Sequence, residues 1–440
     1  MKDSEITSVS ARRVWDSRGN PTVEAEVCLS CGALGRAIAP AGASRGSREA
    51  VDLRDGGTQF GGQNVMNAVS NVNSLIALDL TGRDAFDQQA IDDALIALDG
   101  TPFKSLLGAN ATVAVSMAVL HAAASAKQVA LWQHIADLSG RTPTIPLPEI
   151  QIFGGGAHAG RRVDVQDFMI MVPGAESFEE ALEITAEIYR AAGAIMSNKG
   201  QNMGVADEGG WWPVFGSNEE ALETLVQAIE IAGEVPGERV VISLDIAASE
   251  FSKDGRYRLA LEDRELGRDE MIRLLGDWID AYPIVSIEDP LAEDDTEGII
   301  TFTKEFGERI QIIGDDYFVT NDDLVSKAAW EGACNAVLIK VNQSGTVSES
   351  MDCFNMAVNR GYGAVVSARS GETEDVTISH LAVGLAAGQL KVGSFTRSER
   401  MAKWNECLRI ADQSGAGEFV KGTPLTGTWW TAEKEGDSKL

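Results

Sequence analysis

Short apolar segments that alternate with stretches of helical periodicity constrain the fold of the second part of this 440-residue chain. Each apolar segment closes on a polar residue. This alternation indicates parallel β-strands joined by helices, and enough such units in series close into a β/α barrel. The segments are 240–245, 284–288, 310–315, 336–340 and 364–369.

The residues that close these segments form the first set of candidate site residues. In a β/α barrel the carboxyl ends of the strands carry the chemistry, so the five should converge on one mouth. The alternative is that each is a solvated strand-end residue, which is common for any single one. The five are Asp245, Glu288, Asp315, Lys340 and Arg369.

The first part of the chain has a different organisation. Three β-rich runs surround a turn cluster at 16–21 and indicate an antiparallel meander, and several stretches of helical periodicity follow. The proline-rich segment 141–146 is the candidate boundary. We expect an N-terminal α+β domain, 1–142, and a catalytic barrel domain, 143–440. The β-rich runs are 8–14, 22–28 and 35–39, and the helical stretches are 65–78, 88–98, 111–126 and 130–138.

Charge and composition limit the partners. A net charge of -29 repels phosphate backbones and anionic lipid, so neither nucleic acid nor a membrane is an expected partner. The most apolar segment, 109–126, is alanine-rich and interrupted by polar residues, which favours a buried helix over a membrane span. The first residues lack a signal-peptide pattern, and five cysteines, an odd number, are typical of reduced thiols. The expected location is the cytoplasm.

The three carboxylates of the set predict a metal site. Asp245, Glu288 and Asp315 would repel one another unless a cation lies among them, and an all-oxygen ligand set favours Mg²⁺. Beside that metal the ammonium form of Lys340 is disfavoured, so its pKa can fall toward neutrality and it can act as a base. Removing a proton α to a carboxylate builds negative charge that a coordinated metal stabilises.

Further residues are expected at the same mouth. Lys391 could add a cation opposite the metal, and Arg369 with Ser370 suits an oxyanion such as phosphate, although Arg369 could equally belong to a structural ion pair. The acidic pair within 204–210 could supply a proton to a departing hydroxide, or form a plain turn. The glycine-rich loop 154–160 could close over an anion through its one polar side chain.

The sequence strongly resembles the enolase family over nearly its whole length. That resemblance implies an N-terminal α+β capping domain on a modified, TIM-like β/α barrel, one tightly held Mg²⁺ with a second that arrives with the substrate, and a homodimer or higher homo-oligomer. A magnesium-assisted lysine base is the known chemistry of this superfamily. The matching motifs are DSRGNPT (16–22), LGANA (107–111), DEGG (207–210), SIEDP (286–290), LIKVNQ (338–343) and RSGETED (369–375).

The resemblance also assigns roles by position. The first metal would be held by Asp245, Glu288 and Asp315, and the base would be Lys340. Glu208 would be the general acid, and Lys391 and Gln166 would lie around the substrate carboxylate and metal. The phosphate-side contacts would be Arg369, Ser370 and His158. Ser44 would be the loop ligand of a second Mg²⁺.

Several residues depart from the family pattern around this pocket. Where family members have a histidine before the Arg-Ser pair, this chain has Ala368. Where they have an asparagine and a glutamate on the side opposite the base, it has Gly154 and Asp167, and Trp211 and Trp212 replace smaller residues beyond the acidic pair. The mobile loop 41–45 also differs from the family's, with Ala41 and Arg45 at its ends. Room made by Ala368 and Gly154, and charge added by Arg45, would suit an extra anionic group.

These departures favour a specialised paralogue over an ordinary enolase. We expect a Mg²⁺-dependent enzyme acting on a small phosphate- or phosphonate-bearing carboxylic acid and forming an enolpyruvate product, with a transfer step as in a carboxyphosphonoenolpyruvate synthase of phosphonate natural-product biosynthesis. One alternative is a housekeeping enolase, which interconverts 2-phosphoglycerate with phosphoenolpyruvate and water. The other is a non-catalytic scaffold, which is disfavoured because burying so many charges without a ligand is costly.

Overall fold

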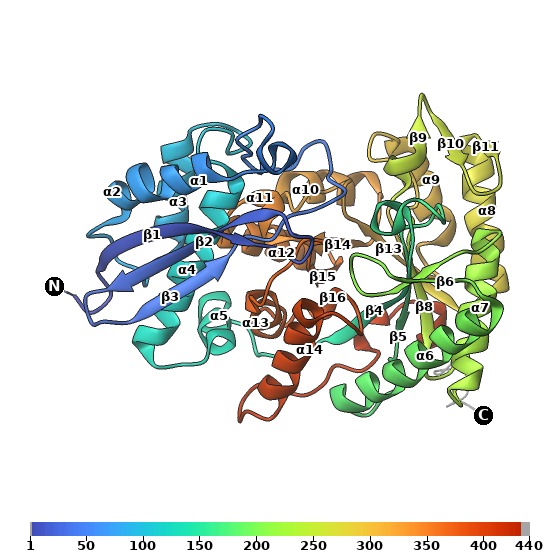
Figure 1. Ribbon diagram of the computed structural model, residues 1–440. Helices are drawn as coiled ribbons and strands as arrows, with labels where there is room; N and C mark the ends of the chain where they lie inside the picture. The colour runs from blue at the N-terminus through green and yellow to red at the C-terminus, as the bar shows by residue number, and fades with distance from the viewer. Residues whose placement is uncertain (1, 433–440) are drawn as a thin grey trace.

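The N-terminal domain opens with the expected meander. The computed structural model describes residues 2–432, and β1 (Ile6–Trp15), β2 (Pro21–Leu29) and β3 (Leu34–Ile38) form one antiparallel sheet (Figure 1). Asp16 organises the turn between β1 and β2, because its Oδ1 accepts the backbone N–H groups of Arg18 at 2.9 Å and Asn20 at 2.8 Å. Such Asx-type bonds explain why the turn cluster was readable from the sequence.

Helices cover one side of this sheet, and α4 lies against it. Most of α4 is buried, and it packs on β2 and β3. Gly35 permits the close approach, because a Cβ there would lie 2.0 Å from the carbonyl oxygen of Ala118. The helices are α1 (Met66–Asn71), α2 (Ala77–Leu80), α3 (Gln88–Asp99), α4 (Ala109–Lys127) and α5 (Leu131–Ser139), with one π-helical stretch, Val72–Ile76, between the first two.

Helix α4 is the one helix among residues 2–432 that is long and apolar enough to cross a membrane by length and composition. In the structure, 83% of its most apolar window is buried inside the protein. Its apolar character is therefore accounted for by packing in the domain core.

The second domain is the predicted barrel. Eight strands follow the order β16-β15-β14-β13-β12-β8-β5-β4, and pairing of β16 with β4 closes it. Strand β5 runs antiparallel to both of its neighbours, and the other barrel pairs are parallel. The strands are β4 (Leu147–Gly154), β5 (Asp167–Met171), β8 (Val241–Asp245), β12 (Ile284–Glu288), β13 (Gln311–Gly314), β14 (Ala336–Ile339), β15 (Gly363–Ser367) and β16 (Gly388–Ser394).

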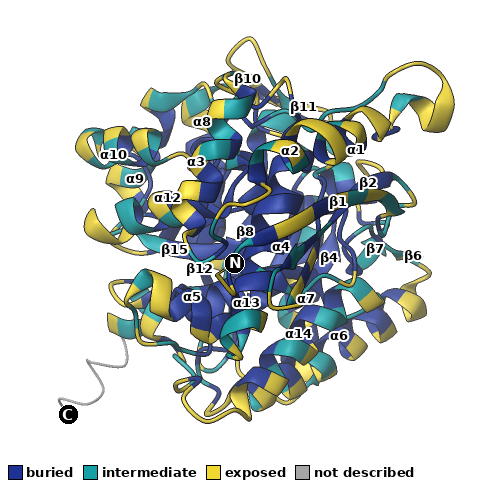
Figure 2. Cartoon of the chain, turned by 90° about the vertical axis from the view of Figure 1, so that its left-hand side faces the viewer, coloured by how far each residue is buried: buried dark blue, intermediate teal, exposed yellow. Residues whose placement is uncertain are grey.

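The remaining elements surround this barrel, whose strands are buried while the outer helices carry exposed faces (Figure 2). The helices are α6 (Phe178–Lys199), α7 (Asn218–Ile231), α8 (Arg268–Ala281), α9 (Thr296–Phe306), α10 (Asp322–Glu331), α11 (Val341–Ser344), α12 (Val347–Asn359), α13 (Thr377–Gly384) and α14 (Ser398–Ala411). The short strands are β6 (Asn202–Val205), β7 (Trp211–Pro213), β9 (Ser252–Lys253), β10 (Arg256–Leu259) and β11 (Arg264–Leu266).

A buried carboxylate joins the two domains. Asp92 on α3 is fully buried, and its Oδ2 accepts the backbone N–H of Ser348 at 2.9 Å and the Ser348 hydroxyl at 2.6 Å. Gln88 Nε2 donates to the same carboxylate at 3.2 Å. Because Ser348 lies in the first turn of α12, these bonds fix the cap domain against the barrel.

We expect Asp92→Ala to lower the free energy of unfolding by about 2–3 kcal/mol, because it leaves the buried donors of Ser348 without this acceptor and leaves Gln88 Nε2 with Ser116 alone. Guanidinium denaturation followed by circular dichroism measures the change. The matched control is Asp93→Ala, which removes the neighbouring exposed carboxylate and its 2.9 Å bond from Gln89. A loss no larger than the control's would contradict the role given to Asp92.

Helix α5 carries a histidine whose pKa makes stability depend on pH. Burial lowers the pKa of His134 to about 4, and nearby Lys127 adds to the shift. A histidine in the unfolded chain titrates near pH 6.5. Between about pH 6.5 and pH 4, His134 therefore binds a proton in the unfolded chain but not in the folded chain. The stabilisation from neutral His134 is therefore complete above about pH 6.5 and is lost as the pH falls toward 4.

We expect His134→Gln to reduce this dependence. Between pH 7 and pH 5 the variant should lose about 2 kcal/mol less unfolding free energy than the parent protein. Denaturant titrations at the two pH values measure the difference. Equal losses in both proteins would show that His134 remains protonatable in the folded state.

Candidate active site

The carboxyl ends of the barrel strands bring the predicted residues together. Asp245 and Glu288 are register partners at the ends of β8 and β12, and Asp315 and Lys340 directly follow β13 and β14. A small, partly open cavity lies at this mouth. All but two of the predicted site residues line it, namely Ser44, His158, Gln166, Asp167, Glu208, Asp245, Lys340, Arg369, Ser370 and Lys391.

The other two, Glu288 and Asp315, pair with the lysines of this cavity. Lys391 Nζ donates to Asp245 Oδ2 at 2.9 Å and to Glu288 Oε2 at 2.7 Å. Lys340 Nζ donates to Asp315 Oδ2 at 2.5 Å. The two ammonium groups thus offset the repulsion among the three carboxylates. That repulsion is the reason why a cation was predicted at this site.

The pKa of Lys340 differs from the sequence-based prediction. Burial lowers this pKa, but the carboxylates of Asp315 and Glu288 outweigh burial and raise it above its usual value. The predicted fall concerns a site in which a metal ion takes Asp315 away from the lysine, and it stays a prediction for that state. Lys340 becomes a base only when that carboxylate has another cationic partner.

The mouth fits a hard divalent cation. Glu288 Oε1 and Gln166 Oε1 are buried acceptor oxygens with no hydrogen-bond partner, and the surrounding donor set is oxygen. Such acceptors match the ligand preference of Mg²⁺. Asp245, Glu288 and Asp315 would hold it once the lysines withdraw, since ammonium groups now pair with all three carboxylates.

Two groups of possible metal ligands among residues 2–432 have their ligand atoms within 4.8 Å of one another, and neither is the predicted set of Asp245, Glu288 and Asp315. One consists of Asp289, Asp315 and Asp316. Asp289 accepts the backbone N–H groups of Asp315 and Asp316, each at 2.9 Å, so hydrogen bonds already account for its position beside β13. Burial and the Asp315 charge raise the pKa of Asp289 to about 8.

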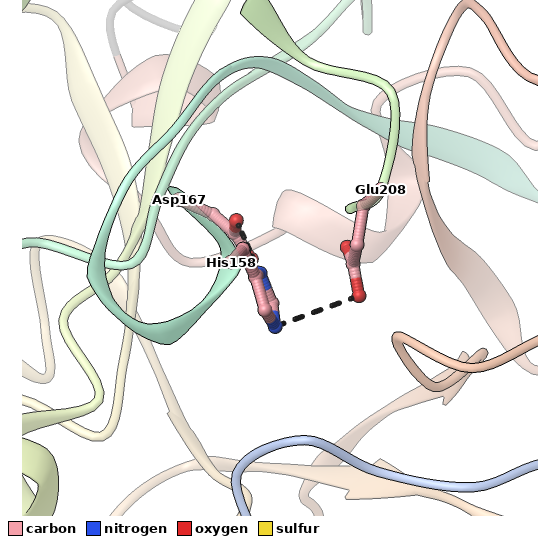
Figure 3. Close-up of side chains that lie close together, drawn as sticks. All are labelled: His158, Asp167 and Glu208. Carbon is pink, nitrogen blue, oxygen red and sulfur yellow. Dashed lines mark hydrogen bonds and ion pairs between the residues drawn. The ribbon is translucent and has the colours of Figure 1, made fainter. Parts of the chain in front are cut away.

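The other group occupies the opposite wall of the cavity. His158 points its two nitrogens at two carboxylates, with Nδ1 at 3.3 Å from Asp167 Oδ1 and Nε2 at 3.8 Å from Glu208 Oε1 (Figure 3). Burial lowers the pKa of His158, but these carboxylates outweigh it and raise the pKa to about 9. His158 is therefore a cation near neutral pH. Gln151, which sequence patterns did not single out, donates to Asp167 from Nε2 and accepts the Gly210 N–H.

Arg369 and Ser370, the residues predicted to contact a substrate phosphate, form hydrogen bonds with the loop 41–45. Arg369 donates from Nη1 to Glu49 Oε2 at 3.0 Å and from Nη2 to the Ser44 carbonyl at 2.9 Å. Ser370 Oγ accepts the Ala43 N–H at 2.8 Å. Arg369 thus forms the ion pair that the sequence left as an alternative, and it also lines the cavity. Glu49 was missed because no motif marks it.

The departures from the family pattern do not all reach the cavity. Ala368 lines it, as expected. Gly154 makes no room, because a Cβ there would lie 2.5 Å from the Cβ of Ala206, which fills the space. Trp211 stacks on Tyr189 with ring centroids 4.7 Å apart, against α6, and neither it nor Trp212 lines the cavity. The expected opening therefore reduces to Ala368.

A closed barrel with one reversed strand, an α+β cap and a ring of buried carboxylates and lysines at its mouth defines the enolase class of barrel proteins. Family models agree with this assignment. The one described as "Enolase, C-terminal TIM barrel domain" matches residues 142–426, and "Enolase, N-terminal domain" matches residues 6–135.

A curated relative is similar over almost the whole chain. The protein named "Enolase 1" from Desulfitobacterium hafniense (strain Y51) is 49% identical over 419 residues, which cover 94% of this chain and 95% of the relative. The chain therefore belongs to the enolase family, and the family and fold predicted from the sequence are confirmed.

Proposed function

We propose that this protein is a Mg²⁺-dependent lyase that dehydrates a small phosphate-bearing hydroxy acid of the 2-phosphoglycerate type to an enolpyruvate product. The observation that carries the proposal is that a buried lysine, Lys340, and a buried carboxyl, Glu208, line one cavity whose adjoining carboxylates fit a divalent cation. Similarity to the relative named "Enolase 1" supports the same reaction.

The chain's own residues divide the work. Bound Mg²⁺ would supply positive charge where the substrate carboxylate gains negative charge. Asp245, Glu288 and Asp315 would hold that ion. With Asp315 so engaged, Lys340 Nζ loses its ion-pair partner and accepts the proton from the carbon next to the substrate carboxylate.

The opposite wall handles the leaving group. Glu208 passes a proton to the departing hydroxyl, and cationic His158, whose Nε2 lies 3.8 Å from Glu208 Oε1, is the source of that proton. Lys391 orients the substrate carboxylate, while Arg369 and Ser370 border the end of the cavity that faces the loop 41–45. Ser44, in that loop, would be the ligand of a second Mg²⁺.

The direct test is formation of phosphoenolpyruvate from 2-phosphoglycerate by purified protein with Mg²⁺, followed by ultraviolet absorbance. Turnover that EDTA abolishes and added Mg²⁺ restores is the expected result. Mg²⁺ binding without any α-proton exchange into deuterated water would contradict the proposal and leave the scaffold alternative.

A second candidate function rests on Ala368. An alanine in the cavity wall leaves space that an imidazole would fill, which suits a larger or doubly anionic substrate and a transfer step, as in a carboxyphosphonoenolpyruvate synthase. Comparing the protein with Ala368→His on 2-phosphoglycerate tests this. Lower turnover of 2-phosphoglycerate by the parent protein than by the variant favours the specialised enzyme, and higher turnover favours the ordinary one.

We also propose that the protein acts in the cytoplasm as a homodimer or higher homo-oligomer. The five cysteines are free, as expected in a reducing compartment. Analytical ultracentrifugation gives the assembly state, and a monomer at micromolar concentration would contradict the proposed assembly.

A further inference from the structure

A fourth carboxylate faces Lys391 from inside the barrel. Glu149 lies on β4, is fully buried, and is the register partner of Lys391 on β16. One of its oxygens, Oε1, accepts the hydroxyl of Ser243. The other, Oε2, is buried and has no hydrogen-bond partner. Burying an unpaired carboxylate oxygen is costly, so this atom calls for a donor.

The present partners of Lys391 are the residues that would hold the metal. Its ammonium bonds Asp245 at 2.9 Å and Glu288 at 2.7 Å. A divalent cation on those two carboxylates repels the ammonium and weakens both as its acceptors. Because a buried lysine is stable as a cation only beside strong acceptors, another carboxylate is needed to keep Lys391 charged.

Two other carboxylates are near Lys391, those of Asp167 and Glu149. Asp167 Oδ2 is 3.7 Å from Lys391 Nζ, and this carboxylate already serves His158 and Gln151. Glu149 is bound only by Ser243 and keeps one oxygen free. Burial raises the pKa of Glu149, and the charge of Lys391 opposes that rise, so the two side chains already attract each other electrostatically.

We propose that Glu149 is a positioning residue that receives the Lys391 ammonium when a divalent cation binds Asp245 and Glu288. The exchange keeps Lys391 charged and close to the cavity, where it can meet an anionic substrate. It moves no covalent bond, since one ion pair replaces another. The inference rests on the proposed function only in taking Mg²⁺ as the cation.

The exchange predicts energetic coupling between Glu149 and Lys391 in metal binding. In Glu149→Gln the ammonium has only Asp167, which already serves His158 and Gln151, as another charged acceptor, so it continues to compete for Asp245 and Glu288. We expect the Mg²⁺ dissociation constant to rise about tenfold, as for other residues that act through a ligand. In a Lys391→Met background no ammonium competes, so adding Glu149→Gln should change the constant less than twofold.

Isothermal titration with Mg²⁺ alone, without substrate, measures all four proteins of this double-mutant cycle. Ser243→Ala is the matched control, because it removes the hydroxyl bonded to Glu149 but keeps the carboxylate, and we expect less than a twofold change. Circular dichroism establishes that each variant is folded. Should Glu149→Gln fail to fold, Glu149→Met, an apolar side chain of similar volume, takes its place in the same cycle.

The outcomes separate the inference from the function on which it rests. Equal weakening by Glu149→Gln in both backgrounds would show that Glu149 only adds negative potential, and unchanged affinity in the single variant would show no role at all; either overturns the inference. No Mg²⁺ binding by the parent protein would overturn the proposed function itself. We expect Glu149→Gln to weaken Mg²⁺ binding only in the background that retains Lys391.

Discussion

Replacing Lys340 by alanine is expected to slow α-proton abstraction by about 10²- to 10⁴-fold, which is the range that a positioned general base contributes. Lys340 lines the cavity and pairs with Asp315, so the variant removes the candidate proton acceptor without disturbing the wall that carries Glu208. Exchange of the substrate α-proton with deuterated water, followed by NMR, isolates this step from expulsion of the hydroxyl.

Three comparisons make the Lys340 result interpretable. Lys253→Ala removes an exposed lysine from a surface hairpin and should retain full exchange. The thermal midpoint and Mg²⁺ affinity of Lys340→Ala should stay near those of the parent protein. Exchange within tenfold of the parent rate would remove Lys340 from the base role and direct attention to the His158 and Glu208 wall.

Much of the barrel was predictable because its later strands are short apolar runs closed by charged residues. Asp245, Glu288, Asp315 and Lys340 each stand at a strand end, so barrel geometry alone predicts that they meet. Strands β4 and β5 were not predicted, because they flank a glycine-rich loop and β5 runs in the reverse direction, which breaks the β-then-α alternation.

The unpredicted parts of the site depend on contacts between distant segments. Glu149 and Gln151 lie on β4, and only closure of the barrel by β16 brings Glu149 beside Lys391. Gly154 illustrates the reverse error, because its small size suggested space that Ala206 in fact fills. The identity of a residue indicates the chemistry of its side chain, whereas tertiary structure determines which residues surround it.

Neutralising one carboxylate at the mouth should nearly abolish stabilisation by magnesium. Glu288→Gln keeps the side-chain volume but replaces a charged ligand with a weak one, and we expect Mg²⁺ affinity to fall about 100-fold, at the upper end of effects seen around metal sites. At a Mg²⁺ concentration 100 times the parent dissociation constant, the parent gains about 2.7 kcal/mol of unfolding free energy and the variant about 0.4 kcal/mol.

Thermal and denaturant unfolding with Mg²⁺ or with EDTA measure these gains. Without metal the variant should remain folded, because glutamine can still accept a hydrogen bond from Lys391 in place of the present 2.7 Å ion pair. Glu297→Gln, which changes an exposed carboxylate of α9 paired with Arg268, should keep the parent's response to Mg²⁺. A full magnesium response in Glu288→Gln would exclude Glu288 as a ligand and would place the bound ion on other carboxylates.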